Sequence, residues 1–206
     1  MNLKKKEGKI FVISGPSGSG KSSITREILK MPNTVFSISM TTRKIRDGEE
    51  DGVNYYFVTD EEYDKTVQEN GFLEHAEIYN HKYGTPKKQA LENLNNGLDV
   101  ILEIEMEGAL QVKSNYPDAV LIYVLPPSLR ELRERIEARG TDSKEEIEKR
   151  LDGTIRELGY LNKYDYFVIN DDFNEAINDV RAIVNAEKNK VSNLVDNVIN
   201  EYIKEK

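Results

Sequence analysis

Short apolar runs alternate with segments of helical spacing over most of the chain. Four runs have the near-continuous apolar character of strands that are buried on both faces of a sheet: 9–13, 100–105, 119–125 and 167–169. Helical patterns separate or follow these runs, at 21–30, 107–114, 128–139, from 143, and from 172 nearly to the end. Strands joined in this way are parallel, because each helical connection crosses back over the sheet. The pattern predicts an α/β fold with a parallel sheet.

The segment 38–97 interrupts this alternation. Short strand-like pieces such as 72–78 surround a helix that begins at a capping box, Thr59-x-x-Glu62. We interpret 38–97 as an insertion into the α/β core. A second segment, 128–161, is helical and strongly charged, and it also lies outside the alternating pattern.

The composition limits the classes of function. The 206-residue chain has no cysteine, which excludes disulfides and zinc–thiolate sites, and its two histidines, His75 and His81, cannot supply a metal site alone. A formal net charge of −8 argues against a broad surface for duplex nucleic acid. No run approaches eighteen apolar residues, and the basic N-terminus lacks a signal-peptide core. We therefore expect no nucleic-acid partner, no membrane segment and a cytoplasmic location.

A glycine-rich turn follows the first apolar run. It matches G-x-x-x-x-G-K-[ST] without a mismatch, as Gly15-Pro16-Ser17-Gly18-Ser19-Gly20-Lys21-Ser22. In this motif the glycines let main-chain N–H groups surround phosphates, Lys21 reaches the β- and γ-phosphates, and Ser22 can bind Mg²⁺. Average residue usage would produce the pattern by chance in roughly one per cent of chains of this length. Its place between a buried strand and a helix favours a genuine ATP-binding P-loop.

Two acidic residues follow a neighbouring apolar run. Glu103 and Glu105 are two positions apart, so in a strand they share one face. They come at the carboxyl end of that strand, where open α/β sheets bind their ligands. This favours an acidic contribution to the Mg²⁺ site, although two solvated glutamates at the point where a strand leaves the core would give the same sequence.

The inserted segment opens with a basic stretch, 39–49, which has three cations in four residues. The guanidinium groups of Arg43 and Arg46 can each present a planar fork to phosphate oxygens, so the stretch is suited to a second phosphate. Taken alone, the stretch is better explained as a solvated basic loop.

These motifs resemble those of the guanylate kinase family when they are taken in order. They are G-P-S-G-S-G-K-S at 15–22, S-x-T-T-R-x-x-R-x-G-E at 39–49, N-Y-Y-F at 54–57, F-L-E-H-A at 72–76, Y-G-T at 83–85, I-E-M-E-G at 104–108 and P-P-S at 126–128. The similarity covers about 8–188, and its motifs are specific as a set. It implies a P-loop NTPase-type core with an inserted nucleoside-monophosphate-binding domain and a helical lid.

The resemblance also implies roles for individual residues. The GMP phosphate would be held by two guanidinium groups and two phenol hydroxyls, those of Arg43, Arg46, Tyr55 and Tyr83. Ser39 and Glu74 would face the guanine, with Thr85 beside them. Guanine offers N1–H and N2–H₂ donors to a carboxylate, and its O6 to a hydroxyl, whereas adenine has neither N1–H nor a 2-amino group. Without the family pattern, each of these tyrosines would be read as a core or surface residue.

Two positions depart from the family. The strand of the family often ends in Asp where this chain has Glu105, so the contact of Glu105 with the guanine pocket is less firmly implied than its acidic function. Residues 189–206 extend past the similarity, with apolar residues at helical spacing: Val191, Leu194, Val195, Val198, Ile199 and Tyr202. We predict a terminal helix that packs on the core or on a partner, and assign it no chemistry.

The charged helices carry the arginines that the family places in its lid. Arg135 and Arg139 are at i and i+4, and Arg150 is on the next helix. By resemblance they would close over the transferring phosphoryl group and neutralise its charge. Surface ion pairs with nearby glutamates are the alternative, which we prefer for Arg130 and Arg133. Asn170 would line the adenine side of the ATP site.

The sequence thus predicts one guanylate kinase-like domain over 1–206. Its parts would be a core of 8–37, 98–127 and 162–188, a GMP-binding insertion at 38–97, a lid at 128–161 and a helical extension at 189–206. The expected reaction is ATP-dependent phosphorylation of GMP, and of dGMP as well, with Mg²⁺ as the cofactor. Monomer and homo-oligomer both remain open. Two alternatives are a kinase of another nucleoside monophosphate and a non-catalytic guanylate-kinase-like interaction module.

Overall fold

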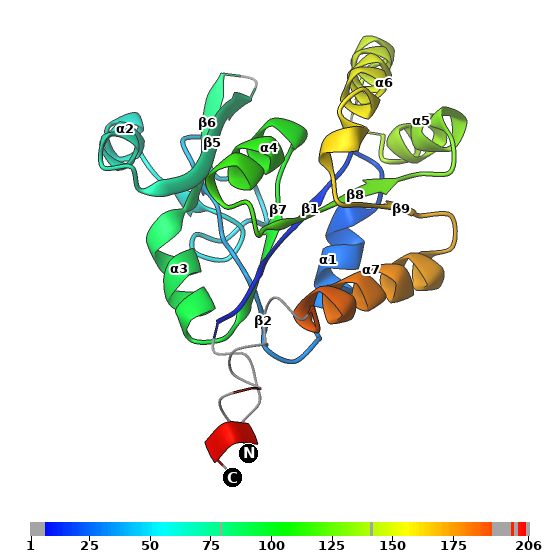
Figure 1. The fold of residues 1–206 in the computed structure, drawn as a ribbon. Coiled ribbons are helices and arrows are strands. Elements are labelled where there is room, and N and C mark those ends of the chain that lie inside the picture. The colour runs from blue at the N-terminus through cyan, green and yellow to red at the C-terminus, as the bar shows by residue number, and fades with distance from the viewer. Residues whose placement is uncertain (1–6, 79, 141, 191–198, 200–201, 205–206) are drawn as a thin grey trace.

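A computed structural model describes residues 7–78, 80–140, 142–190, 199 and 202–204 (Figure 1). Its central sheet has five parallel strands in the order β2-β7-β1-β8-β9. Their bounds are β1 Ile10–Ser14, β2 Thr34–Phe36, β7 Asp99–Glu103, β8 Val120–Leu125 and β9 Tyr166–Ile169. The parallel α/β core predicted from the alternating pattern is confirmed.

The strand register explains why the central runs are apolar throughout. Val12 pairs with Leu102 on one side and Leu121 on the other, and all three belong to one core cluster. The preceding residues of each strand point to the opposite face and belong to a second cluster. Because alternate residues of a strand face opposite sides, a sheet covered on both faces needs apolar residues at every position.

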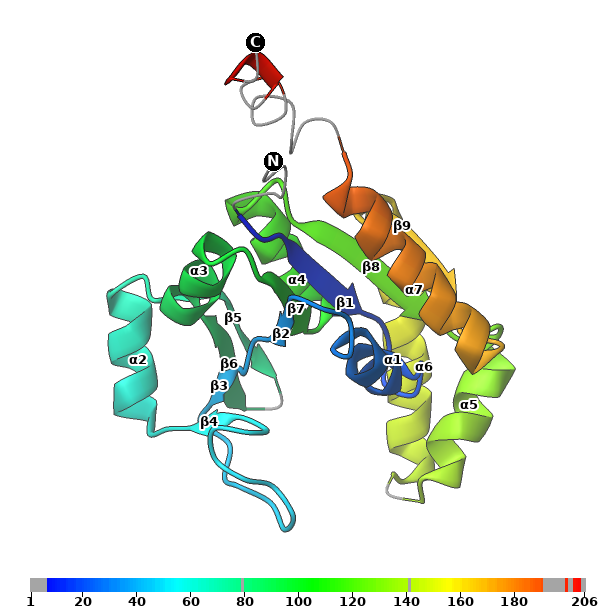
Figure 2. The ribbon, with the colours of Figure 1, turned by 90° about the horizontal axis from the view of Figure 1, so that it is seen from below.

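Helices cover both faces of this sheet (Figure 2). α1 (Lys21–Ile28) and α7 (Phe173–Lys188) pack on one face through their isoleucine, valine and alanine side chains. α3 (Lys87–Asn95) and α4 (Met106–Asn115) pack on the other face, with Ala90 and Ala109 in its core cluster. α3 is the last helix of the inserted segment, yet its apolar face lies on the central sheet.

The inserted segment contains a sheet of its own, in the order β4-β3-β6-β5. Its strands are β3 Met40–Thr41, β4 Tyr56–Phe57, β5 Phe72–Ile78 and β6 His81–Pro86. α2 (Asp60–Gln68) packs against it, because the Tyr63 ring lies 4.8 Å from that of Phe72 and its hydroxyl donates a 2.6 Å hydrogen bond to the Tyr83 carbonyl. The predicted capping box at the start of α2 is present.

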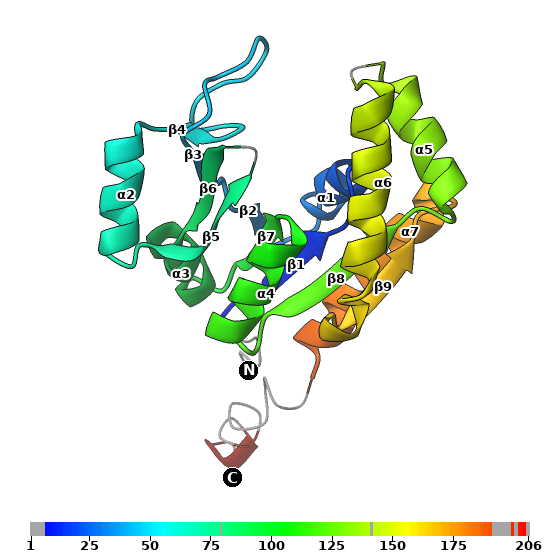
Figure 3. The ribbon, with the colours of Figure 1, turned by 90° about the horizontal axis from the view of Figure 1, so that it is seen from above.

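Two charged helices, α5 (Leu129–Ala138) and α6 (Lys144–Leu158), form a separate layer with its own apolar cluster. A short 3-10 helix, η1 (Leu161–Lys163), connects α6 to β9. Figure 3 shows this layer on one side of the central sheet and the inserted sheet with α2 on the other side. The N-cap Ser128 accepts from the Glu131 main chain, and the Glu131 side chain pairs with Arg135 instead of reaching back to Ser128.

The two ends of the chain differ from the simplest reading of the pattern. α7 ends at Lys188, so the prediction of a helix running nearly to the C-terminus fails at that point. Four apolar residues of the predicted terminal helix lie outside the described residues: Val191, Leu194, Val195 and Val198. Ile199 and Tyr202 are described, and both are exposed. Within the part of the chain that the structure describes, no helix is both long and apolar enough to cross a membrane.

Candidate active site

The glycine-rich turn joins β1 to α1 at the carboxyl edge of the central sheet. Gly15 has φ 147°, and a Cβ there would lie 2.2 Å from the Val124 carbonyl oxygen. Gly20 is the left-handed N-cap of α1, and a Cβ there would lie 2.2 Å from Asn170 Nδ2. Only glycine fits such backbone conformations and such close neighbours. The turn therefore has the shape that lets main-chain N–H groups surround a phosphate.

The two residues that follow this turn meet the two acidic residues identified after β7. Lys21 Nζ lies 3.7 Å from Glu105 Oε1, and the Ser22 hydroxyl donates a hydrogen bond to the Glu103 carboxylate. β7 ends at Glu103, and Glu105 is the N-cap of α4, so the expectation that both glutamates share one strand face is wrong. They reach the P-loop by different routes, one from the strand end and one from the start of a helix.

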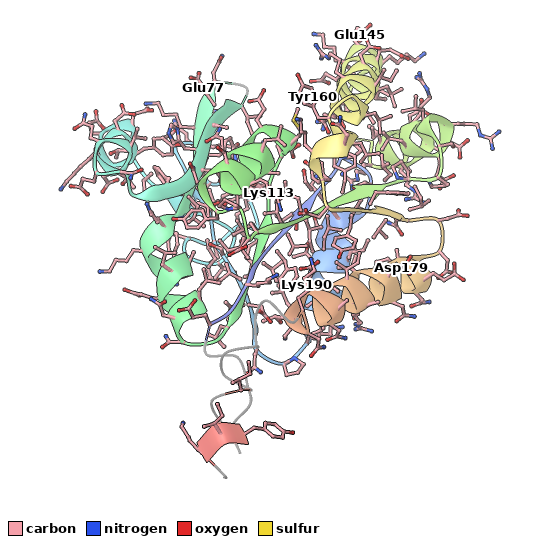
Figure 4. All side chains as sticks on the ribbon, in the orientation of Figure 1. Glu77, Lys113, Glu145, Tyr160, Asp179 and Lys190 are labelled. Carbon is pink, nitrogen blue, oxygen red and sulfur yellow. The ribbon has the colours of Figure 1, made fainter. Side chains whose placement is uncertain are left out.

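A cavity of about 610 Å³ joins this edge of the sheet to the inserted segment and to α6. Nine of the residues singled out in the sequence line it: Pro16, Ser17, Ser39, Tyr55, Glu74, Tyr83, Glu103, Glu105 and Arg150. Its walls come from two separate arms, as Figure 4 shows by its labels Glu77 on the inserted sheet and Glu145 on α6. Residues from four parts of the sequence thus face one space.

The inserted sheet contributes a buried carboxylate to this cavity. The Glu74 side chain belongs to a residue that is only 5% exposed, and the Thr85 hydroxyl donates a 2.6 Å hydrogen bond to Oε1. Burial raises the pKa of Glu74 above its usual range, and the hydroxyl and main-chain N–H of Thr85 oppose that shift. Ser39 lines the same cavity. A carboxylate and a hydroxyl can together bind a base that offers N–H donors and a carbonyl.

The basic stretch at the start of the insertion also reaches this region. Arg43 is buried and forms a two-point ion pair with Glu49, with N···O distances of 3.0 and 2.8 Å. This hydrogen bond raises the pKa of the Arg43 guanidinium. Tyr55 and Tyr83 pack edge to face 5.9 Å apart, and the Arg43 guanidinium lies 5.5 Å from the Tyr55 ring. Arg46 is exposed, and its main-chain N–H donates to Glu49.

The three arginines that the sequence analysis assigned to the lid differ in whether they line the cavity. Arg150 lines it and forms a 2.9 Å ion pair with Asp142. Arg135 bonds to Glu131 and, at 3.1 Å, to the main-chain oxygen of Asn170. Arg139 is exposed, with no ion pair among the described residues. The structure therefore brings Arg150 to the site and leaves Arg135 and Arg139 outside its lining.

Asn170 is hydrogen-bonded to the P-loop turn. Its side chain is buried and donates a 2.7 Å hydrogen bond to the Ser19 carbonyl. The place next to Gly20 is therefore filled by an amide that fixes the turn. That Asn170 lines the adenine side of the ATP site stays a prediction.

Several lining residues were not identified from the sequence. Among them are Lys149, Gly153, Arg156 and Glu157 on α6, and Gly108 on α4. Glu157 accepts a 2.7 Å hydrogen bond from the Tyr123 hydroxyl of β8, and burial raises the pKa of its carboxyl group. The spacing of Glu157, seven residues after Arg150, placed it on the same face of a helix, and that signal could have identified it.

Comparison with known proteins places the chain in a family. The guanylate kinase family model matches residues 7–187. A guanylate kinase of Caldanaerobacter subterraneus subsp. tengcongensis is 51% identical over 91% of each chain, and one of Clostridioides difficile is 48% identical over 97% of this chain and 98% of its own. The crystal structure of guanylate kinase from Anaplasma phagocytophilum superposes with a TM-score of 0.76 at 33% identity, covering 92% of this chain and 90% of that one. The chain belongs to the guanylate kinase family.

Proposed function

We propose that this protein transfers the γ-phosphoryl group of ATP to GMP, giving ADP and GDP. The observation that carries the proposal is the common cavity, which is lined by P-loop residues on one side and by the buried Glu74 carboxylate on the other. A nucleoside monophosphate held by its base at Glu74 would have its phosphate between the two arms, next to the P-loop. dGMP shares the base and the phosphate, so it belongs to the same proposal.

The base would be selected by the groups of the inserted sheet. In the proposed complex, Glu74 accepts hydrogen bonds from guanine N1–H and N2–H₂, Ser39 donates to O6, and Thr85 holds the carboxylate in place. The 2.6 Å bond from Thr85 leaves the second carboxylate oxygen for the ligand. Adenine lacks both of these donors, so it would leave a buried carboxylate without partners, which is unfavourable.

Phosphates would replace carboxylates as partners of several cations. Lys21, Arg43, Arg135 and Arg150 each face a carboxylate, from Glu105, Glu49, Glu131 and Asp142 respectively. In the proposed complex Arg43, Arg46, Tyr55 and Tyr83 hold the GMP phosphate, while Lys21 reaches the β- and γ-phosphates of ATP. An oxygen of GMP then bonds to the γ-phosphorus, and the bond from that phosphorus to the bridging oxygen of ADP breaks.

The helices α5 and α6 would act as a lid over this reaction. Arg150 already lines the cavity, and closure would add Arg135 and Arg139 to the charge around the transferring group. Closure also excludes water, which would otherwise accept the phosphoryl group. The proposed division is therefore an α/β core, an inserted GMP-binding part at 38–97 and a lid at 128–161.

Ser22 and Glu103 fit a Mg²⁺ ion that accompanies ATP. Both offer oxygen atoms, which this cation prefers, and the two side chains are hydrogen-bonded to each other at the end of β7. Mg²⁺ usually takes only one or two protein ligands beside phosphate oxygens and water, which agrees with the lack of a cluster of three His, Asp or Glu side chains among the described residues. The ion would neutralise charge on the phosphates. We also propose that the reaction takes place in the cytoplasm.

A side-by-side assay tests this function. ADP formation from ATP and Mg²⁺ would be measured with GMP, dGMP, AMP, UMP and CMP as acceptors. We expect efficient turnover with GMP and dGMP, and a preference over AMP of roughly 10³-fold or more in kcat/KM. Equal use of AMP would favour a kinase of another monophosphate, and no turnover with any acceptor would favour an interaction module.

A further inference from the structure

The guanine-selecting carboxylate is aimed by an irregularity in its strand. Phe72 pairs with Pro86 and His75 pairs with Gly84, so two residues of β5, Leu73 and Glu74, stand opposite one residue of β6. Such a bulge turns two successive side chains toward the same side of a sheet. Leu73 and Glu74 are accordingly both buried, one in the core cluster and the other at the cavity.

α4 is held against this bulge by two side-chain amides. Gln111 accepts a 3.2 Å hydrogen bond from the His75 main-chain N–H and donates one of 3.0 Å to the His75 carbonyl. Asn115 donates a 3.1 Å hydrogen bond to the Leu73 carbonyl. These bonds satisfy main-chain groups on both sides of Glu74. They fix the distance between α4 and β5, so the helix cannot move away from the carboxylate without losing them.

Gly108 lies on the same face of α4, three and seven residues before these amides. A Cβ at Gly108 would lie 2.6 Å from Glu74 Oε2 and 3.1 Å from its Cδ. The backbone there is helical and its φ is negative, so the conformation does not call for glycine. What the position requires is space, and Glu74 Oε2 occupies it.

We propose that Gly108 is a specificity-determining position, whose missing side chain sets where the Glu74 carboxylate stands and hence how guanine is bound. The inference rests on the proposed function of Glu74. An added methyl group would push Oε2 by roughly 0.8 Å to reach ordinary contact at 3.4 Å. Thr85 holds the other oxygen, so the displacement turns the carboxylate out of position. Such sites tolerate only about 0.5 Å of error.

The test is Gly108→Ala, measured by steady-state kinetics, ATP binding and thermal unfolding. Alanine is the better helix former, and the atom that must move is at the end of a side chain, so we expect a Tm equal to or above that of the wild type. We expect kcat/KM for GMP to fall about 10- to 100-fold, while the Kd for ATP changes less than about twofold. The protein would thus lose GMP use without losing stability.

Two further variants separate this role from a general structural one. Gly153→Ala on α6 is the control for the effect of the exchange on stability, because no described atom outside the neighbouring turns of its own helix lies within 4 Å of the added Cβ. Gly153 also lines the cavity, so this control is compared by its Tm and not by kcat/KM. Glu74→Asp shortens the side chain and leaves room for the methyl group. In that background Gly108→Ala should cost less than about threefold in kcat/KM, because the contact is gone.

The outcomes distinguish this inference from the proposed function. If the wild type does not prefer GMP to AMP, the proposed function fails. If it does, and Gly108→Ala keeps the wild-type kcat/KM for GMP, Gly108 has no part in specificity. A Gly108→Ala protein with a lower Tm than the wild type, or an equal cost of the change in both backgrounds, would also overturn the inference, since the methyl group would then act through the backbone.

Discussion

Replacing Glu74 by glutamine tests how the base is recognised. The change keeps the size of the side chain and removes its charge. Because Thr85 donates its hydroxyl proton to Oε1 at 2.6 Å, the amide oxygen of glutamine would take the Oε1 place and its NH₂ group the Oε2 place. The NH₂ group is a donor, so it would face the donors of guanine.

The expected loss follows from these contacts. Hydrogen bonds to a charged group contribute about 1.5–3 kcal/mol each, and Glu74 is proposed to accept two from guanine. A loss of about 3 kcal/mol or more corresponds to at least about 10²-fold in kcat/KM for GMP. ATP binding should be almost unchanged, because the P-loop is at the other side of the cavity.

Unlike its effect on activity, the Glu74→Gln change should not lower the stability of the ligand-free protein. Burial raises the pKa of Glu74 in the folded state, so its ionised form destabilises the fold at neutral pH. The glutamine variant carries no charge and should have a free energy of unfolding equal to or above that of the wild type at pH 7. The difference should shrink as the pH falls and the carboxyl group of the wild type becomes protonated.

Three measurements decide the matter: kcat/KM for GMP and AMP, the Kd for ATP, and urea unfolding at pH 7 and pH 4. A Glu74→Gln enzyme with wild-type kcat/KM for GMP would refute the guanine assignment. A variant that loses stability at pH 7 as well as activity would show that Glu74 acts through folding, which contradicts the reasoning from its raised pKa.

The remaining predictions concern the P-loop, the lid and the Glu187 carboxylate in the last turn of α7. Lys21→Met should lower kcat at least about 10²-fold with the fold intact, and near-normal turnover of a folded variant would contradict the P-loop mechanism. Arg150→Ala should lower kcat much more than it raises the Kd for GMP, because the charge of Arg150 acts in the transition state. An unchanged Kd together with an unchanged kcat would show that Arg150 forms only a surface ion pair. Burial alone would raise the pKa of Glu187, but hydrogen bonds from Lys190, Tyr166 and Lys9 lower it to about 2, so its stabilisation is present above pH 4.5 and is lost as the pH falls toward 2. Glu187→Gln should therefore lower the free energy of unfolding at pH 7, by no more than about 3 kcal/mol, and by less at pH 3; a gap independent of pH would count against this pairing.

The sequence by itself determined the core of this protein. Apolar runs joined by helices predicted the parallel sheet, because the period of the side chains along a strand or helix is a local property. The P-loop could be located for the same reason, since its glycines, Lys21 and Ser22 act within one short turn. Glu103 and Glu105 were also found, because carboxyl ends of parallel strands share one edge of a sheet.

Only the tertiary structure decided how these residues reach the site. The pattern could not show that β7 stops at Glu103 and that Glu105 begins a helix, because the apolar Ile104 between the two glutamates also fits a strand that continues to Glu105. It could not separate Arg150, which lines the cavity, from Arg139, which has the same charge on an exposed turn. The position of a long side chain depends on how its helix packs.

The guanine side of the site depended most on tertiary structure. Glu74 was assigned from a family motif, but the bulge that turns it inward exists only in the pairing of β5 with β6. The space it occupies exists only because Gly108 lies against it, thirty-four residues later in the chain. Local periodicity determines which elements form, whereas pairing and packing between distant segments determine where their side chains meet, and a single sequence does not contain that second kind of information in any short pattern.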